Sequence, residues 1–430
     1  MKQVRPVRCC SGITGFIAMR VFLFVFLSQA LLCAGVFGHH EKQEEHHEKQ
    51  VDDHTEETSP LQKIVPGNVK FSYSFYNHLA NKYPSDNLFL SPMSISLLFS
   101  MLSAGAKGQT QTQIHETLGF NVSTTSEDIN KGFQQLLRLV NQPNTDLELN
   151  SANALFLEQH TELVEKFIED LKDFYESEVI HSDFQKGDEA KNQINAYVEK
   201  KTNGKIKELL KSVSPATLLV LINTIYFKGT WLHSFDETRT READFHVDEN
   251  KSIKVPMMTI REKFLVAIVR EMGFVMVDIP YKGNTSAILI VPDKGKLQEV
   301  ERALQNVSMQ TWRRLIRPME IFVSIPKFCV EATINLKSEL SEMGMKDVFT
   351  GKANLSGITK QQVEVSEAIH KAVLRVDEKG SEAAGASAAV ITKLSLPFQV
   401  IADRPFLITI LHKPTNTILF TGRIMKPENC

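Results

Sequence analysis

One stretch of the chain constrains the fold more than any other. The run TLLVLINTIYF, residues 217–227, is apolar at most of its positions. A strand with one face in water alternates apolar and polar residues, whereas a strand covered on both faces need not do so. The run therefore predicts a central strand of a large sheet, with other layers packed against both of its faces.

The other periodic segments place helices early and strands late. Apolar residues recur at helical spacing in residues 71–83 and 94–106. A third helix is predicted at residues 162–175, and its apolar face comprises Val164, Phe167, Ile168, Leu171 and Tyr175. Strands are predicted at SAILIVP and EIFVSIP, and at FLITILH and TILFTGRI, which flank the turn signal KPTN. This order predicts an α+β fold with large sheets.

Composition and motifs exclude several classes of function. The chain has 430 residues, 42% of them hydrophobic and 23% charged, which is ordinary for a globular protein with a large core. Its 49 basic and 51 acidic residues give a net charge of -2, so we expect no nucleic-acid partner. The sequence contains no Gly-x-Ser-x-Gly elbow, no Walker-type loop and no His-Glu-x-x-His. We therefore expect neither an enzyme nor a bound cofactor.

Residues 1–38 have the order of a secretory signal. Basic residues up to Arg20 precede the apolar run Val21–Val36, and small residues follow it. The run falls short of the roughly 20 residues that a spanning helix needs, so a membrane anchor is the weaker interpretation. Met19 is an alternative start, because a complete signal begins there. The sequence predicts a secreted, extracellular protein that does not bind a membrane.

Residues 39–60 form an acidic tail rich in histidine. Its first 20 residues carry eight acidic and two basic side chains and almost no apolar ones, so we expect disorder. The histidines His39, His40, His46 and His47 leave a weak metal-binding role open. A solvated tail is the favoured interpretation, and no metal site is predicted.

The cysteines predict no disulfide framework. Cys9, Cys10 and Cys33 lie in the segment that we expect to be removed, which leaves Cys329 and Cys430. A secreted chain of this size has no need of a disulfide to complete its core. No disulfide is therefore predicted, although a thiol at the C-terminus could form mixed disulfides.

Five Asn-X-Ser/Thr sequons occur in the chain. Behind a secretory signal such sequons predict glycosylated surface positions. They are Asn121, Asn250, Asn284, Asn306 and Asn354.

One long segment, Ser381–Pro397, separates two strand-like regions and is rich in small residues. Segments of this length without secondary structure are usually functional or disordered, and composition alone favours a flexible linker. Every second residue from Ser381 to Ile391 is small or apolar, and the only charge of that stretch, Glu382, falls on the alternate face. The segment could therefore enter a sheet as a strand, with one face buried at little desolvation cost.

Several blocks of the sequence resemble the serpin family, and its α1-antitrypsin-like group in particular. They are NLFLSPMSISLLFSMLSAGAKGQT, LINTIYFKGTW, DFHVDENKSIKVPMM, HKAVLRVDEKGSEAAGASAA and DRPFLITILHKPTNTILFTGRIMKP. The resemblance covers residues 66–430 and implies one serpin domain, residues 61–430. That domain has helices packed around three β-sheets, with a large central sheet A and an exposed reactive-centre loop at about residues 378–398.

The resemblance implies a suicide inhibitor of serine proteases rather than an enzyme. A target protease attacks the loop and forms an acyl-enzyme, and the cut loop then inserts into sheet A and distorts the protease. Aligning the family's Glu-Lys-Gly start with Glu378 places the scissile bond at Leu394–Ser395, with a cut after Lys393 as the alternative. A leucine before the cut suits chymotrypsin-like or elastase-like proteases.

Other family positions carry over residue by residue. The hinge matches Glu378, Gly380, Ser381, Ala383, Ala384 and Gly385. The shutter, where sheet A parts, matches Ser91, Ser94, Asn223 and His370. The breach, where insertion begins, matches Trp231, Lys327 and Glu378, and the last two are expected to form an ion pair.

Two further expectations concern partners. Residues 110–122 contain neither Lys nor Arg, so the basic stripe of heparin-binding members is missing and heparin activation is not expected. We expect a monomer that forms a covalent acyl-enzyme complex with its target serine protease. The alternative is a non-inhibitory member that carries a hormone or another ligand, and the small residues of the hinge argue for inhibition.

Overall fold

The computed structural model describes residues 59–141, 147–304, 314–379 and 397–428. The predictions for the signal segment, the acidic tail, the hinge after Lys379, the scissile bond and Asn306 lie outside these residues. The described helices are α1 (Pro60–Lys82), α2 (Pro92–Gly105), α3 (Gly108–Thr117), α4 (Ser126–Val140), α5 (Glu165–Tyr175), α6 (Gly187–Lys201), α7 (Leu297–Leu304) and α9 (Leu336–Glu342).

The described strands form two hydrogen-bonded sheets. The five-stranded sheet has the order β10 (Phe328–Asn335), β11 (Val365–Val376), β4 (Leu219–Gly229), β2 (Leu147–Glu158), β3 (Glu178–Ser182). The nine-stranded sheet has the order β1 (Leu88–Leu90), β14 (Thr417–Ile424), β13 (Phe406–His412), β8 (Thr285–Pro292), β7 (Phe274–Pro280), β6 (Ser252–Val269), β9 (Arg317–Pro326), β12 (Phe398–Ile401), and β5 (Arg241–His246) pairs with β6.

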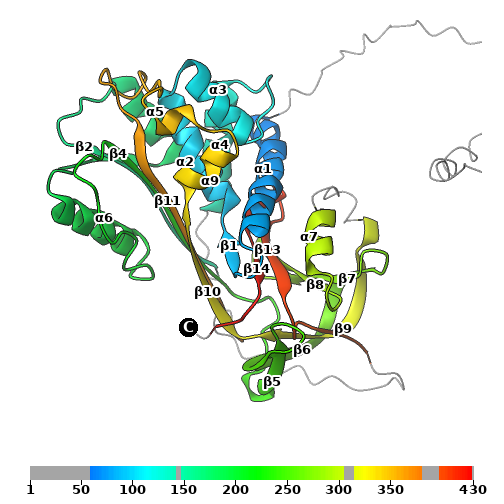
Figure 1. The fold of residues 1–430 in the computed structure, drawn as a ribbon. Helices are drawn as coiled ribbons and strands as arrows, with labels where there is room; N and C mark the ends of the chain where they lie inside the picture. Colours follow the sequence, from blue (N-terminus) through cyan, green and yellow to red (C-terminus); the bar gives the residue numbers. More distant parts are fainter. Residues whose placement is uncertain (1–58, 142–146, 305–313, 380–396, 429–430) are drawn as a thin grey trace, which may run out of the picture. The chain divides into compact units, whose positions relative to one another are not determined.

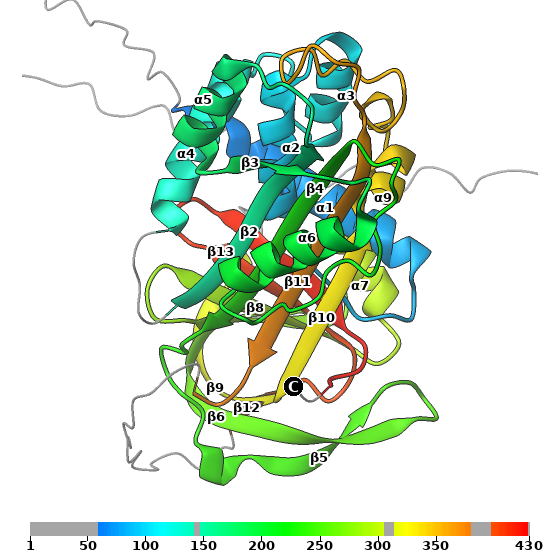
Figure 2. The same cartoon turned by 90° about the vertical axis from the view of Figure 1, so that its left-hand side faces the viewer.

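Strand β4 confirms the predicted central strand. Its alternate residues pack into two different cores, because successive side chains of a strand point to opposite faces. Val220, Ile222 and Tyr226 belong to the core beneath helix α6. Leu221 and Phe227 belong to the main core, to which α1 and α2 contribute. Figure 1 shows α6 on one side of the five-stranded sheet and α1 and α2 on the other, and Figure 2 shows α6 lying across the face of the sheet.

The nine-stranded sheet combines what the resemblance predicts as two separate sheets. Strand β6 is 18 residues long, and different parts of it pair with different neighbours. Its first residues pair with β5, its middle pairs with β9 and its last residues pair with β7. The predicted fold class is confirmed, with the second and third sheets joined through this one long strand.

The predicted hairpin near the C-terminus is also confirmed. Strands β13 and β14 pair antiparallel, from Phe406 opposite Ile424 to His412 opposite Thr417. The KPTN segment forms the turn between them, and Asn416 adopts a positive φ of 55°. Asparagine tolerates this left-handed conformation better than most residues, which explains its place at the end of the turn.

Helix α5 (Glu165–Tyr175) differs from its prediction at two residues of the expected face. Val164 is the N-cap, outside the helix, and is only partly buried against the core. Phe167, Leu171 and Tyr175 are buried, as expected from their spacing of four residues, but Ile168 is 48% exposed. One residue further along a helix lies about 100° around its axis, so Ile168 falls at the margin of the buried face. Its side chain instead lines a surface pocket.

The prediction of no disulfide is wrong. Cys329, in the edge strand β10, is disulfide-bonded. Its backbone N–H also donates to the carbonyl oxygen of Glu428 at 2.8 Å, so the residues that follow β14 run beside β10. The size of the core, on which the prediction rested, does not reveal whether such a crosslink is present.

In the ranges that the structure describes, no helix is both long enough and apolar enough to cross a lipid bilayer.

Candidate functional site

The parallel pair β4–β11 lies at the centre of the five-stranded sheet, and we call it the central seam. Its register runs from Leu219 opposite Val365 to Phe227 opposite Leu374. On the outer sides, β2 pairs antiparallel with β4, and β10 pairs antiparallel with β11. Parallel pairing is slightly less stable per residue than antiparallel pairing. A strand that entered the seam in the opposite direction would therefore gain antiparallel partners on both sides.

A set of mostly buried polar side chains spans the seam near its middle, and we call it the shutter cluster. It comprises Ser91, Ser94, Asn153, Asn223 and His370. Asn223 lies directly opposite His370 across the seam and opposite Asn153 on its other side. Ser91, Ser94, Asn223 and His370 are all 0–1% exposed.

The two serines reach the cluster from the start of helix α2. Ser91 is the N-cap residue, and Pro92 takes the first helical position, a common and favourable combination. The Ser91 hydroxyl donates to the carbonyl oxygen of Leu419 at 2.6 Å and accepts from the N–H of Ser94 at 3.3 Å. This cap ties the start of α2 to the buried strand β14, and the backbone N–H of Ser91 ties it to His370 in the seam.

Asn223 connects the serines with the histidine. Its amide nitrogen donates to the Ser94 hydroxyl and to Oδ1 of Asn153, and its Oδ1 contacts Nδ1 of His370. The amide thus has partners on both of its ends, as a fully buried amide requires. Asn153 was not among the predicted residues, because the register between β2 and β4 is needed to place it there.

His370 is held neutral with a defined tautomer. The N–H of Ser91 donates to Nε2 of His370 at 3.1 Å, so the ring proton must lie on Nδ1, where it can be donated to Oδ1 of Asn223. Complete burial lowers the pKa of His370 to about 3. A charged imidazolium would have no counterion among these partners, and the cluster is therefore built around the neutral ring.

A second cluster lies where β4 and β11 end, and we call it the breach cluster. It contains the expected ion pair, with Nζ of Lys327 2.8 Å from Oε2 of Glu378. Thr240 donates its hydroxyl to the other carboxylate oxygen at 2.9 Å, and the carbonyl of Glu378 accepts from the N–H of Phe235 at 3.0 Å. The lysine side chain is 43% exposed while that of the glutamate is 6% exposed. Burial raises the pKa of Glu378, but the hydrogen bonds from Lys327 and Thr240 outweigh it and keep the pKa below its usual value.

Trp231 holds the neighbouring turn of the breach cluster. Its indole Nε1–H donates to the carbonyl oxygen of Asp377 at 2.9 Å. Its ring stacks on Tyr281 with centroids 4.2 Å apart and planes 12° apart. A Cβ at Gly229 would lie 2.6 Å from that same tyrosine ring, so the last residue of β4 has to be glycine for the stack to form. The carboxylate of Asp377 is 3.2 Å from Lys228.

The two clusters lie one after the other along strands β4 and β11. The shutter cluster joins β4 and β11 at Asn223 and His370, and the breach cluster holds Asp377 and Glu378, which directly follow β11. The predicted hinge residues Gly380, Ser381, Ala383, Ala384 and Gly385, and the bond residues Lys393, Leu394 and Ser395, lie outside the described residues. Of the predicted hinge residues, Glu378 alone therefore lies in the described ranges, where it belongs to the breach cluster.

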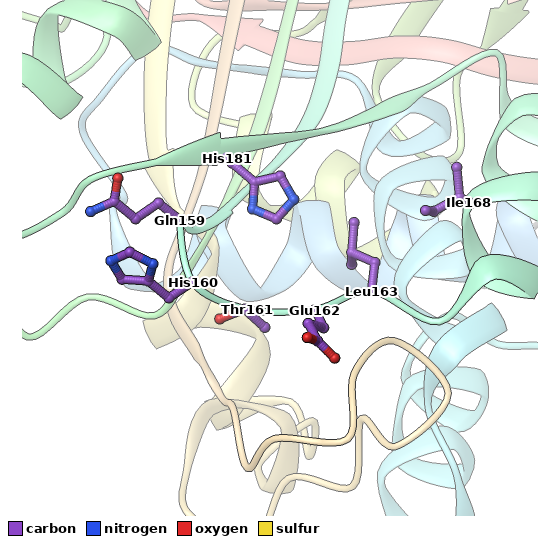
Figure 3. Close-up of a pocket in the computed structure, with 7 residues that line it drawn as sticks. All are labelled: Gln159, His160, Thr161, Glu162, Leu163, Ile168 and His181. Carbon is purple, nitrogen blue, oxygen red and sulfur yellow. The ribbon is translucent and has the colours of Figure 1, made fainter.

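An open pocket of about 530 Å³ lies at the other end of the sheet. Its lining residues are Gln159, His160, Thr161, Glu162, Leu163, Ile168 and His181. Figure 3 shows most of them along the loop after β2, with His181 contributed by β3 and Ile168 by α5. Leu157, just before this loop, pairs with Leu219 at the start of β4. Trp231 of the breach cluster follows the end of β4, so the pocket and the breach cluster lie at opposite ends of this strand. Of the predicted site residues that the structure describes, none lines the pocket.

Helices α1 and α9 bring together one group that could bind a metal ion. The ligand atoms of His78, Glu339 and Glu342 lie within 4.8 Å of one another. The ammonium group of Lys82 already lies 3.0 Å from Glu339 and 2.7 Å from Glu342. We interpret the group as an ion-pair network between the two helices, because a metal would have to displace this lysine. The histidines of the acidic tail lie outside the described residues.

The sequons that the structure describes are on the surface. Asn121, Asn250, Asn284 and Asn354 are all exposed. Each stands in a connection between elements and not within a regular strand or helix. A glycan attached to any of these four side chains would therefore extend into solvent.

Comparison with known proteins agrees with this geometry. Residues 66–427 match the family model described as "Serpin (serine protease inhibitor)". Alpha-1-antiproteinase of Bos taurus is 40% identical over 422 residues, which cover 95% of this chain and 99% of that protein. An alpha-1-antitrypsin-like protein of Tamias sibiricus is 42% identical over 374 residues, covering 86% and 91%. Serpin A3-5 of Bos taurus is 41% identical over 368 residues, covering 85% and 89%.

Solved structures show the same fold. Human thyroxine-binding globulin, solved in complex with thyroxine, gives a TM-score of 0.81 at 36% identity, covering 86% of this chain and all (100%) of that one. Uncleaved ovalbumin gives a TM-score of 0.78 at 29% identity, covering 85% and 100%. Relatives and neighbours therefore include proteins named as protease inhibitors and a protein named for binding thyroxine. With this agreement of sequence, fold and structural matches, the chain belongs to the serpin family, whose members are typically inhibitors of serine proteases and not enzymes.

Proposed function

We propose that the protein is a secreted suicide inhibitor of a chymotrypsin-like or elastase-like serine protease. The observation that carries the proposal is the central seam, a parallel β4–β11 pair whose strand β11 runs directly toward the segment 381–397. That segment keeps one face free of charge, so it can become an antiparallel strand between β4 and β11 without burying an unpaired ion.

The reaction begins at Leu394–Ser395, with Lys393 as the alternative residue before the cut. The serine of the target protease attacks the carbonyl carbon of Leu394 and displaces the amine of Ser395, which leaves Leu394 bound to the protease as an ester. Water would normally hydrolyse this ester. Insertion of the cut loop moves the attached protease away from its starting position before that hydrolysis takes place.

The described residues determine what insertion must break. At the end of the seam, the bonds of Glu378 to Lys327 and of Asp377 to Trp231 hold the start of the loop outside the sheet. In the middle, His370 and Asn223 contact each other directly, so an entering strand has to separate them. These are short-range hydrogen bonds of neutral groups and one ion pair, which can re-form with a new neighbour.

Location, processing and partners complete the proposal. We assign residues 1–38 to a signal peptide, with Met19 as an alternative start, and residues 39–60 to a tail that precedes the inhibitory domain at residues 61–430. The exposed sequons would carry glycans in the extracellular space. The partner is the target protease, bound as a covalent complex by a monomeric inhibitor that needs no heparin.

A second candidate function is supported by one observation. Thyroxine-binding globulin, a hormone-binding protein by its name, resembles this chain over its whole length. A carrier need not insert its loop, whereas an inhibitor must do so. The small residues Ser381, Ala383 and Gly385 at the hinge favour inhibition over transport alone.

One experiment separates the two functions. The purified mature protein is incubated with chymotrypsin, trypsin and elastase, and the mixtures are run on denaturing gels. An inhibitor gives a complex with one of the proteases that survives denaturation, and N-terminal sequencing of the C-terminal fragment begins at Ser395. A non-inhibitory carrier gives cleavage without any stable complex and leaves the protease fully active.

A further inference from the structure

The ladder of the central seam is irregular at one point, close to the start of β11. Its pairing with β4 shifts between Val365 and Glu367, so that Ser366 has no partner residue on β4. An extra residue of this kind is a β-bulge, which interrupts the backbone ladder locally and can redirect a side chain. The seam therefore contains one position at which a side chain can take the place of a ladder bond.

The hydroxyl of Ser366 joins β11 to the chain that leads into β4. It accepts the backbone N–H of Leu218, the residue directly before β4, at 2.9 Å. The carbonyl oxygen of Leu218 accepts the N–H of Glu158, the last residue of β2, at 3.0 Å. The backbone of Leu218 is thus bound to β2 on one side and, through a serine side chain, to β11 on the other. This bond, which we call the seam latch, closes the seam at the end opposite to the breach cluster.

Helix α9 holds the bulged residue in position. Lys337, in the first turn of α9, donates from Nζ to the carbonyl oxygen of Ser366 at 3.0 Å. The helix begins directly after β10, where the side chain of Asn335 caps it by accepting the N–H of Ser338 at 3.2 Å. The carbonyl oxygen and the hydroxyl of Ser366 are therefore both engaged, and this directs the hydroxyl toward Leu218.

We propose that Ser366 is a positioning residue for strand insertion, because its hydroxyl must release Leu218 before a new strand can occupy the whole length of the seam. This role rests on the proposed function, which assumes that a strand enters between β4 and β11. Strand β11 has 12 residues, so at about 3.3 Å per residue the seam latch lies roughly 35–40 Å from the breach cluster. A strand that enters at the breach cluster therefore reaches the seam latch last.

The seam latch can be removed without changing the backbone ladder. The bond to Leu218 depends on a hydroxyl, so Ser366→Ala deletes it, whereas Ser366→Thr keeps the hydroxyl on a residue type that favours strands. An interaction that is already lost in the transition state stabilises only the starting state, and its removal speeds the departure from that state. A hydrogen bond of ordinary net strength then corresponds to a change of about fivefold in rate.

The first test does not depend on inhibition. Hydrogen–deuterium exchange of the uncut mature protein is followed by mass spectrometry in peptides that contain Leu218. We expect the N–H of Leu218 to exchange about fivefold faster in Ser366→Ala and at the wild-type rate in Ser366→Thr. Ser177→Ala is the matched control, because this hydroxyl donates to the carbonyl oxygen of Tyr175 at the end of α5, outside the seam. Unchanged exchange at Leu218 in Ser366→Ala would overturn the proposal.

The second test measures insertion itself. The limiting rate of complex formation is determined at saturating inhibitor, with a protease that gives complexes resistant to denaturation. We expect Ser366→Ala to raise this rate about fivefold and to leave the half-saturating concentration unchanged, because the seam latch takes no part in the first encounter. Ser366→Thr and Ser177→Ala should match the wild type. An unchanged limiting rate, despite faster exchange at Leu218, would refute the role in insertion. Faster exchange without a complex from any protease would refute the proposed function and with it that role, while the hydrogen bond across the seam would stand.

Discussion

The shutter cluster predicts a specific dependence of stability on pH. His370 is fully buried without a counterion, and its pKa is lowered from 6.5 to about 3. In the unfolded chain the same ring takes up a proton near pH 6.5, so below that pH the unfolded state binds more protons than the folded state. The stabilising effect of the neutral ring is therefore complete above pH 6.5 and is lost as the pH falls toward 3.

The size of the effect follows from the shift in pKa. Each unit corresponds to about 1.4 kcal/mol, so protonation of the unfolded chain removes about 2 kcal/mol between pH 6.5 and pH 5. The full loss at pH 3 is about 5 kcal/mol on the same scale. Burial is complete for this ring, which leaves no solvent to screen the effect.

The assay compares the wild-type protein with His370→Gln, which cannot titrate. Urea unfolding is measured at about pH 7.5, 6.5, 5.5 and 5, which covers the upper part of the window set by the pKa shift. The variant is less stable at about pH 7.5, and we expect its deficit to shrink by about 2 kcal/mol at pH 5. His115 also has a pKa lowered by burial, to about 4, so both proteins keep that contribution and the comparison cancels it.

The matched control is His181→Gln, which changes an exposed imidazole far from the seam. Its stability relative to the wild type, measured over the same pH range, is the baseline for replacing a histidine outside the seam. If the deficit of His370→Gln stays constant over this range, the fold does not hold the buried ring neutral, and the prediction is refuted.

Three further predictions concern the breach, the hinge and the scissile bond. Lys327→Met should lower the free energy of unfolding in urea by about 1–3 kcal/mol, because the buried carboxylate of Glu378 loses a hydrogen-bond donor. Glu378→Gln should lower it less, because the lysine that loses its partner is exposed to water; equal losses would contradict this asymmetry. Ser381→Arg should turn the inhibitor into a substrate, and denaturation-resistant complexes formed by this variant would refute loop insertion. Leu394→Arg should redirect inhibition toward trypsin-like proteases, and unchanged inhibition of chymotrypsin would place the cut elsewhere.

The sequence alone predicted the parts of the fold that depend on local pattern. The apolar run at residues 217–227 supplies most of β4, which is buried on both faces because α6 covers one side and the main core the other. The KPTN turn is present for the same local reason, since Asn416 tolerates a positive φ. Ile168 was misplaced because helical spacing gives the direction of a buried face but not its width.

The site was harder to predict where it depends on long-range register. Asn153 joins the shutter cluster only because β2 pairs with β4 in a register that sets it opposite Asn223, and a single sequence does not contain that register. Thr240 and Tyr281 complete the breach cluster from distant segments for the same reason. The disulfide at Cys329 was missed because the size of the core does not reveal whether a crosslink is present.

Thermal unfolding of the intact and the loop-cleaved protein tests the inhibitory mechanism most directly. Nicking a chain ordinarily destabilises it, because the unfolded state gains freedom. Insertion of the cut segment between β4 and β11 instead adds two antiparallel ladders, so the melting temperature should rise well above that of the uncut protein. A cleaved protein that melts at the same temperature or lower would contradict the mechanism.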